Sequence, residues 1–119
     1  MKALSKIHPK RGLNLIDVPM PSVKEKDVLI QVHKTGICGT DLHLYDYDTW
    51  ALKNIHLPLI IGHEFVGKVI QTGKEVRNIT IGTLVTAEGH ITCQNCLSCR
   101  SGRRHLCEKT KGLGIHRSG

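Results

Sequence analysis

Aromatic residues make up only 3% of this sequence of 119 residues. Proteins that bind single-stranded nucleic acid stack bases on aromatic side chains, so such a surface has little to be built from. Long apolar runs are also missing, and the longest, at 57–61, is far too short to cross a bilayer. The first residues contain no apolar segment of the length that a secretory signal peptide needs. These absences argue against a single-strand-binding protein, a membrane protein and an exported protein.

The sequence also lacks the strand–Gly-x-Gly-x-x-Gly–helix unit of dinucleotide-binding domains. Gly112-Leu113-Gly114 has only the first half of that pattern, and we interpret it as a turn. The chain stops at Gly119 without a recognisable domain ending. We therefore expect one domain, or part of one, without a nucleotide-binding fold of its own.

The formal net charge is +7 and the isoelectric point is near 9.4. Most basic residues are spread along the chain, apart from a short cluster at 100–105. A solvated basic face is the simplest interpretation, and a nucleic-acid site or the approach of an anionic cofactor are the alternatives.

The sequence pattern predicts a mainly β protein, most clearly at 28–33, where apolar and polar residues alternate after the first pair. We expect strands at 13–18, 28–33, 65–70 and 83–87, separated by glycine- and proline-containing turns. Short helical turns are expected only at 41–47 and 96–104.

Four of the five cysteines form a Cys-x2-Cys-x2-Cys-x7-Cys run. Thiolates brought together by short loops match the tetrahedral, all-sulfur shell that a structural Zn²⁺ prefers. Disulfides would need an oxidising compartment, for which the sequence gives no sign, and a group of inert thiols is a weaker alternative. The run predicts a structural zinc site made by Cys93, Cys96, Cys99 and Cys107.

The fifth cysteine, Cys38, follows the strand expected at 28–33, and His63 and Glu64 directly precede the strand expected at 65–70. A thiolate, an imidazole and a carboxylate are ligands of the kind that a catalytic zinc uses, with one position left open for substrate. Taken alone, these residues are explained equally well as a buried free cysteine and a structural turn histidine.

The neighbours of Cys38 favour the catalytic interpretation. Thr40 offers a hydroxyl two residues away, and Asp41 can orient a ligand imidazole. His43 can exchange protons with water. The segment therefore predicts an open zinc site with a route for a proton to leave it.

These motifs together resemble the zinc-containing medium-chain alcohol dehydrogenase family. The pattern Gly62-His63-Glu64-x2-Gly67-x5-Gly73-x2-Val76 matches the family signature at every fixed position. The Cys-x-x-Asp-x-His segment and the four-cysteine run occur in the same order as in that family. The resemblance covers essentially the whole chain.

The resemblance implies a GroES-like β-barrel catalytic domain at 1–119, incomplete on its C-terminal side, with a structural-zinc lobe at 88–107. A Rossmann domain that binds NAD would lie outside this chain. The resemblance also implies roles for individual residues: a catalytic zinc held by Cys38, His63 and Glu64, a structural zinc held by the four-cysteine run, a proton relay of Thr40 and His43, a buttress for the ligand histidine at Asp41, and a substrate-associated histidine at His90.

Within the family, the segments 88–93 and 103–107 are most similar to members that oxidise L-threonine with NAD to 2-amino-3-oxobutanoate. Such a member is expected to be a cytoplasmic homotetramer, and this chain alone is expected to be inactive. A sorbitol or butanediol dehydrogenase of the same family is the first alternative. A zinc-finger-like nucleic-acid-binding module that uses the basic cluster at 100–105 is an alternative of another class.

Overall fold

The strands expected at 28–33 and 65–70 pair with each other in the computed structural model, which describes residues 1–119. They form β3 (Val28–Thr35) and β5 (Phe65–Thr72), which run antiparallel with Thr35 opposite Phe65. The short β6 (Leu84–Val85) lies on the other edge of β5 and completes a sheet of order β3-β5-β6. The expected mainly β fold class is confirmed.

Two glycines of the signature lie where backbones approach each other closely. A Cβ at Gly67 would lie 2.4 Å from the carbonyl oxygen of Gln31 on the paired strand β3. A Cβ at Gly73 would lie 2.1 Å from the carbonyl oxygen of Lys24. No side chain fits at either distance, so these glycines are required by the packing of β5 and the turn after it against β3 and the loop before it.

A second sheet has the order β2-β1-β4 and is entirely antiparallel. Its strands are β1 (Lys2–Lys6), β2 (Asn14–Asp17) and β4 (Leu59–Ile60). Only β2 was expected from the sequence, within 13–18. The buried hydroxyl of Ser5 donates to the carbonyl oxygen of Leu59 at 2.9 Å, which ties β1 to β4.

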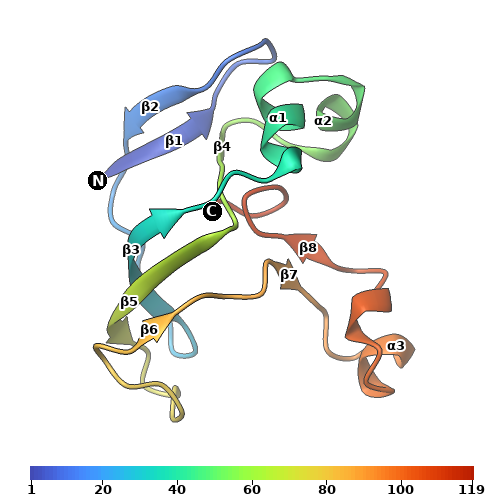
Figure 1. Ribbon diagram of the computed structural model, residues 1–119. Helices are drawn as coiled ribbons and strands as arrows, with labels where there is room; N and C mark the ends of the chain where they lie inside the picture. The colour runs from blue at the N-terminus through green and yellow to red at the C-terminus, as the bar shows by residue number, and fades with distance from the viewer.

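The two helices α1 (Gly39–Asp46) and α2 (Thr49–Asn54) lie together beside this second sheet (Figure 1). A small core joins them and consists of Leu44, Ala51, Ile55 and Leu59. Helix α1 extends the turn expected at 41–47, whereas α2 was not expected. No helix of the structure is both long and apolar enough to span a membrane.

Lys6 fixes the end of α1 to the first hairpin. Its side chain is fully buried, and its ammonium group donates to the backbone carbonyls of Lys10, Gly12 and Tyr45. Tyr45 lies in the last turn of α1, where the helix dipole favours a positive charge. The contact holds α1 in place from the end opposite to Cys38.

The cysteine-rich segment forms a lobe between two short strands, β7 (His90–Ile91) and β8 (Lys111–Gly112), which pair antiparallel. It contains α3 (Leu97–Arg100) and a 3₁₀ turn at Arg104–Leu106, within the helical region expected at 96–104 and just after it. Figure 1 shows that this lobe projects away from both larger sheets. A turn was expected at 112–114, but Gly112 ends β8 and Leu113 forms a bridge with Arg117, so the turn itself lies at 114–116.

Candidate zinc centres and proton relay

The antiparallel pairing of β3 and β5 brings the first group of predicted ligands together. Cys38 follows the end of β3, and His63 and Glu64 precede the start of β5. In an antiparallel pair these two points lie at the same end, and the backbone N–H of Gly36 donates to the carbonyl of Glu64 at 2.9 Å. The structure thus places three residues, separated in sequence, at one end of a single ribbon.

The side chains of this group converge. One ligand atom from each of Cys38, His63 and Glu64 lies within 4.8 Å of the others. Cys38 and His63 are half-buried, whereas Glu64 is exposed. A Cβ at residue 36 would lie 2.6 Å from the Glu64 Oε2, so Gly36 leaves the space that this carboxylate occupies. Gly62, directly before His63, has φ +107°, a conformation that other residues rarely adopt.

Asp41 links both halves of the group. Its Oδ2 accepts a hydrogen bond from the backbone N–H of Cys38 at 2.9 Å, and its Oδ1 lies 3.9 Å from the Nδ1 of His63. That Oδ1 and that Nδ1 are buried and have no hydrogen-bond partner. A ligand histidine characteristically turns one ring nitrogen to the metal and the other to a carboxylate. The donor set and the two unpartnered atoms therefore fit a Zn²⁺ bound by His63 through its other nitrogen.

Thr40 and His43 both lie on α1, which begins at Gly39 directly after Cys38. The Thr40 Oγ1 is 3.6 Å from the Cys38 Sγ. Residues three apart on a helix share a face, so Thr40 and His43 lie one above the other beside the cysteine. His43 reaches solvent, with 53% of its side chain exposed.

The sequence did not reveal that His43 has a partner at the start of the next helix. Its Nδ1 lies 2.5 Å from the Oδ2 of Asp48, which precedes α2. Hydrogen bonds from the backbone N–H of Ala51 and from the His43 ring lower the pKa of Asp48 below its ordinary value. Aspartate is a preferred residue directly before a helix, but α2 is too short to be recognised in the sequence, so this preference did not lead to Asp48.

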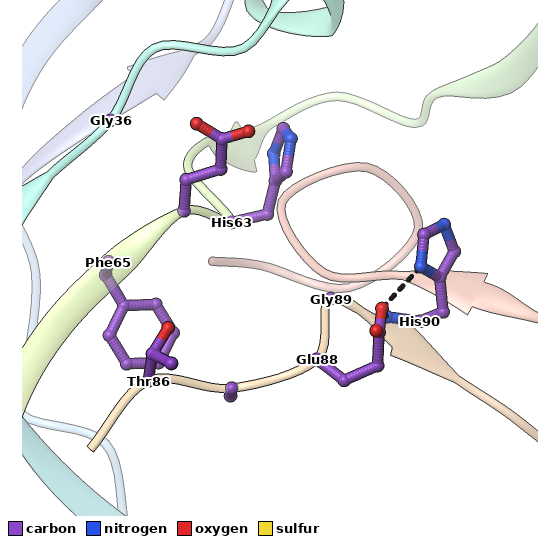
Figure 2. A pocket seen from close by; sticks show the side chains of 9 residues that line it. Gly36, His63, Phe65, Thr86, Glu88, Gly89 and His90 are labelled. Atoms are coloured by element: carbon purple, nitrogen blue, oxygen red, sulfur yellow. Dashed lines mark hydrogen bonds and ion pairs between the residues drawn. The ribbon is translucent and has the colours of Figure 1, made fainter.

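His90 lies apart from the group of predicted ligands, but it lines one cavity together with His63 and Glu64. A cavity of about 440 Å³ is lined by Gly36, His63, Glu64, Phe65, Thr86, Ala87, Glu88, Gly89 and His90. Figure 2 shows His63 and the Glu88–His90 pair lining it together, with Phe65 and Thr86 at its other end. The His90 Nδ1 is 2.6 Å from the Glu88 Oε1, and hydrogen bonds from the His90 side chain and backbone lower the pKa of Glu88.

A second cavity, of about 450 Å³, lies on another side of the same residues. The two cavities share four lining residues, Gly36, His63, Glu64 and Phe65. The second cavity is the more apolar, and its lining includes Leu4, Ile37, Leu42, Tyr45 and Ile61. Two of the three predicted ligands, His63 and Glu64, therefore line two cavities of different chemistry.

The second group of predicted ligands is the four-cysteine run, which the lobe brings together as expected. One sulfur from each of Cys93, Cys96, Cys99 and Cys107 lies within 4.8 Å of the others, and all of them are free thiols. The Cys93 Sγ lies 3.6 Å from that of Cys107 and 3.9 Å from that of Cys99. The disulfide alternative is not realised in this arrangement. The group fits the all-sulfur shell of a structural zinc.

Backbone amides in the lobe point at these sulfurs. The backbone N–H of Cys93 donates to the Cys107 Sγ at 3.5 Å and lowers the pKa of Cys107 to about 6. The N–H groups of Asn95 and Cys96 lower the pKa of Cys93. Burial instead raises the pKa of Cys99 to about 11. Amides directed at thiolates are the arrangement expected around a bound cation, because the metal binds the deprotonated form.

Comparisons with known proteins agree with this geometry. Residues 24–119 match the family described as the alcohol dehydrogenase GroES-like domain. The L-threonine 3-dehydrogenase of Shewanella pealeana is 51% identical over 119 residues, all of this chain and 35% of the relative. The L-threonine 3-dehydrogenase of Shewanella loihica is 50% identical over the same share of both chains. The chain thus spans about a third of the length of these relatives.

Two solved structures have the same fold. A protein described as a zinc-binding dehydrogenase from Sinorhizobium meliloti 1021, bound to NADP, has a TM-score of 0.88 at 35% identity, covering 99% of this chain and 33% of that one. The alcohol dehydrogenase TADH from Thermus sp. ATN1 has a TM-score of 0.81 at 35% identity, covering 98% of this chain and 32% of that one. With the family match over 24–119, these likenesses show that the chain belongs to the alcohol dehydrogenase GroES-like domain family.

Proposed function

We propose that this chain is the zinc- and substrate-binding part of an L-threonine 3-dehydrogenase, which oxidises the secondary hydroxyl of L-threonine with NAD to 2-amino-3-oxobutanoate. The observation that carries the reaction type is the convergence of Cys38, His63 and Glu64, with ligand atoms within 4.8 Å of one another, beside a helix that bears a hydroxyl and an imidazole. The name and identity of the Shewanella relatives support the substrate.

Cys38, His63 and Glu64 would hold the catalytic zinc, and Asp41 would fix the His63 ring from its far side. When bound there, zinc would supply the Lewis acidity that lowers the pKa of a secondary alcohol by several units. Glu64 is exposed, in contrast to the other two ligands, so it is the ligand with most freedom to give way to a substrate oxygen.

Thr40 and His43 would carry the alcohol proton to solvent. The Thr40 hydroxyl, 3.6 Å from the Cys38 sulfur, is placed to accept a proton beside the metal ligands while it donates its own. His43 would take that proton and release it to water, to which its half-exposed side chain has access. Hydride transfer to the nicotinamide is chemistry of the cofactor, which the part of the protein outside this chain would hold.

The four cysteines would hold a structural zinc that takes no part in this reaction. The proposal divides the protein into this GroES-like domain, with its zinc lobe at 88–107, and an NAD-binding domain that is not in the chain. We also propose that the complete protein is a homotetramer. Its expected location is the cytoplasm, where reducing conditions keep ligand cysteines free.

Substrate profiling tests the proposal. The complete enzyme, meaning this chain joined to the part that follows it in its relatives, should reduce NAD with L-threonine far better than with sorbitol or 2,3-butanediol. His90 and Glu88 face the pocket beside His63, and an amino alcohol offers them an ammonium group that a diol does not. Initial rates of NADH formation at equal substrate concentration decide the matter. Faster oxidation of either polyol would refute the substrate assignment and leave the reaction type in place.

A further inference from the structure

The imidazole of His43 is held by the N-cap residue and the first turn of α2. Its Nδ1 lies 2.5 Å from the Oδ2 of Asp48, and its ring centroid lies 5.6 Å from that of Trp50, at an angle of 45°. Two groups from one neighbouring segment therefore restrain a side chain that is 53% exposed. A histidine that only covered the surface would need neither contact.

The carboxylate of Asp48 is itself held in place. Its second oxygen, Oδ1, accepts the backbone N–H groups of Trp50 and Ala51, each at 3.0 Å, and so caps α2. Ala51 is completely buried in the core cluster that also contains Leu44 of α1. One carboxylate thus joins the cap of α2 to the imidazole on α1, and the core fixes the two helices relative to each other.

In the hydrogen bond between His43 and Asp48, the proton is bound to the Nδ1 of the ring. The hydrogen bonds that Asp48 accepts keep its pKa low, so its carboxylate is a pure acceptor and the Nδ1 of His43 is the donor. A neutral imidazole with a proton on Nδ1 has Nε2 as its one acceptor. The other nearby carboxylates have other partners: Asp41 accepts from the Cys38 backbone, and Asp46 pairs with Arg11.

Resting on the relay proposed above, we infer that Asp48 is the positioning residue that holds His43 in the tautomer which can receive a proton at Nε2. An O–H bond of the relay breaks as the Nε2–H bond forms, and the ring becomes an imidazolium that keeps its Nδ1–H bond to Asp48. Loss of the Nε2 proton to water restores the neutral ring. Asp48 accepts a hydrogen bond throughout and is never protonated.

Asp48→Asn separates this role from helix capping. Asparagine caps a helix about as well as aspartate, but it carries no charge. With its carbonyl oxygen on the cap, its NH2 group faces Nδ1 and can only donate, so the ring should change to the Nε2–H tautomer. Asp48→Ala removes both functions. Asp46→Asn is the matched control, because it makes the same chemical change two residues away, at a carboxylate that pairs with Arg11.

Two measurements decide the inference. Imidazole ¹⁵N shifts of His43 in the zinc-loaded protein should report the Nδ1–H tautomer in the parent and in Asp46→Asn, and the Nε2–H tautomer in Asp48→Asn. In the complete enzyme, kcat should fall roughly 3- to 10-fold in Asp48→Asn, as expected for an exposed charged pair that also fixes a tautomer, and remain at the parental value in Asp46→Asn.

An unchanged His43 tautomer in Asp48→Asn would overturn the inference, whatever the rates. Parental turnover in Asp48→Asn would also overturn it if Thr40→Ala is impaired, because the relay would then work without Asp48. Parental turnover in Thr40→Ala would instead refute the relay of the proposed function, and the ¹⁵N shifts would still decide whether Asp48 holds the ring.

Discussion

Replacement of Cys107 by serine should unfold the cysteine lobe at 93–107. The lobe has almost no apolar core of its own, because Leu97 and Leu106 are 81% and 54% exposed and its buried residues are Cys99 and Cys107. A structural zinc contributes roughly 10–16 kcal/mol of apparent binding free energy in small peptides. That exceeds what the few contacts of this lobe can supply. Loss of one of the four sulfurs should therefore remove most of its stability.

Thermal unfolding and limited trypsin digestion measure this effect. Trypsin should cleave the Cys107→Ser protein rapidly at Arg100, Arg103 and Arg104, which lie in the lobe, and spare them in the parent. Cys38→Ser, which removes a sulfur from the other predicted site, is the control and should leave the lobe resistant. Equal melting temperature and equal trypsin resistance of Cys107→Ser and parent would rule out a structural metal.

In the complete enzyme, Thr40→Ala should lower the turnover of L-threonine by about 10²–10⁴-fold, the usual contribution of general acid–base catalysis. The Thr40 Oγ1 lies 3.6 Å from the sulfur of the predicted ligand Cys38, on the same helical face as His43. Without this hydroxyl the alcohol proton loses its first carrier. Removal of the proton is therefore expected to become slow.

Steady-state rates with Thr40→Ser and His43→Ala complete this test. Serine keeps the hydroxyl and should retain most of the activity. His43→Ala should show a smaller defect than Thr40→Ala, partly rescued by imidazole buffer, because an exposed position lets a small base replace the ring. Zinc content should be the same in all variants. Near-parental turnover of Thr40→Ala with its zinc in place would contradict the relay.

The convergence of both groups of predicted ligands could be anticipated, because it depends on local spacing and on one strand pairing. The two-residue gaps between Cys93, Cys96 and Cys99 bring their sulfurs together within one short segment. Cys38 and His63 meet because β3 and β5, both expected from the sequence, pair antiparallel and bring these residues to the same end. The cysteine group needs only the local path of the chain, and the Cys38 group needs only the pairing of β3 with β5.

The partners that orient the site were less accessible to sequence reasoning. Helix α2 has only six residues, too few to produce a helical period, so the approach of Asp48 to His43 could not be anticipated. The strands β1 and β4 were missed for a related reason. Strand β4 has two residues, and its pairing with Ser5 and Lys6 depends on contacts across more than fifty positions.

The core is also small: only 14 of 119 residues are buried, fewer than the length leads one to expect.

The number of zinc ions per chain tests the central claim most directly. Two separate ligand groups, Cys38–His63–Glu64 and the four cysteines, predict two zinc ions in the fully loaded chain by elemental analysis. Mild chelation should remove one ion first and leave the thiolate-bound ion, because four sulfur ligands close its shell. Cys38→Ser and Cys107→Ser should each retain only the ion of the other site. A single zinc ion in the parent, or loss of both ions together, would contradict the account.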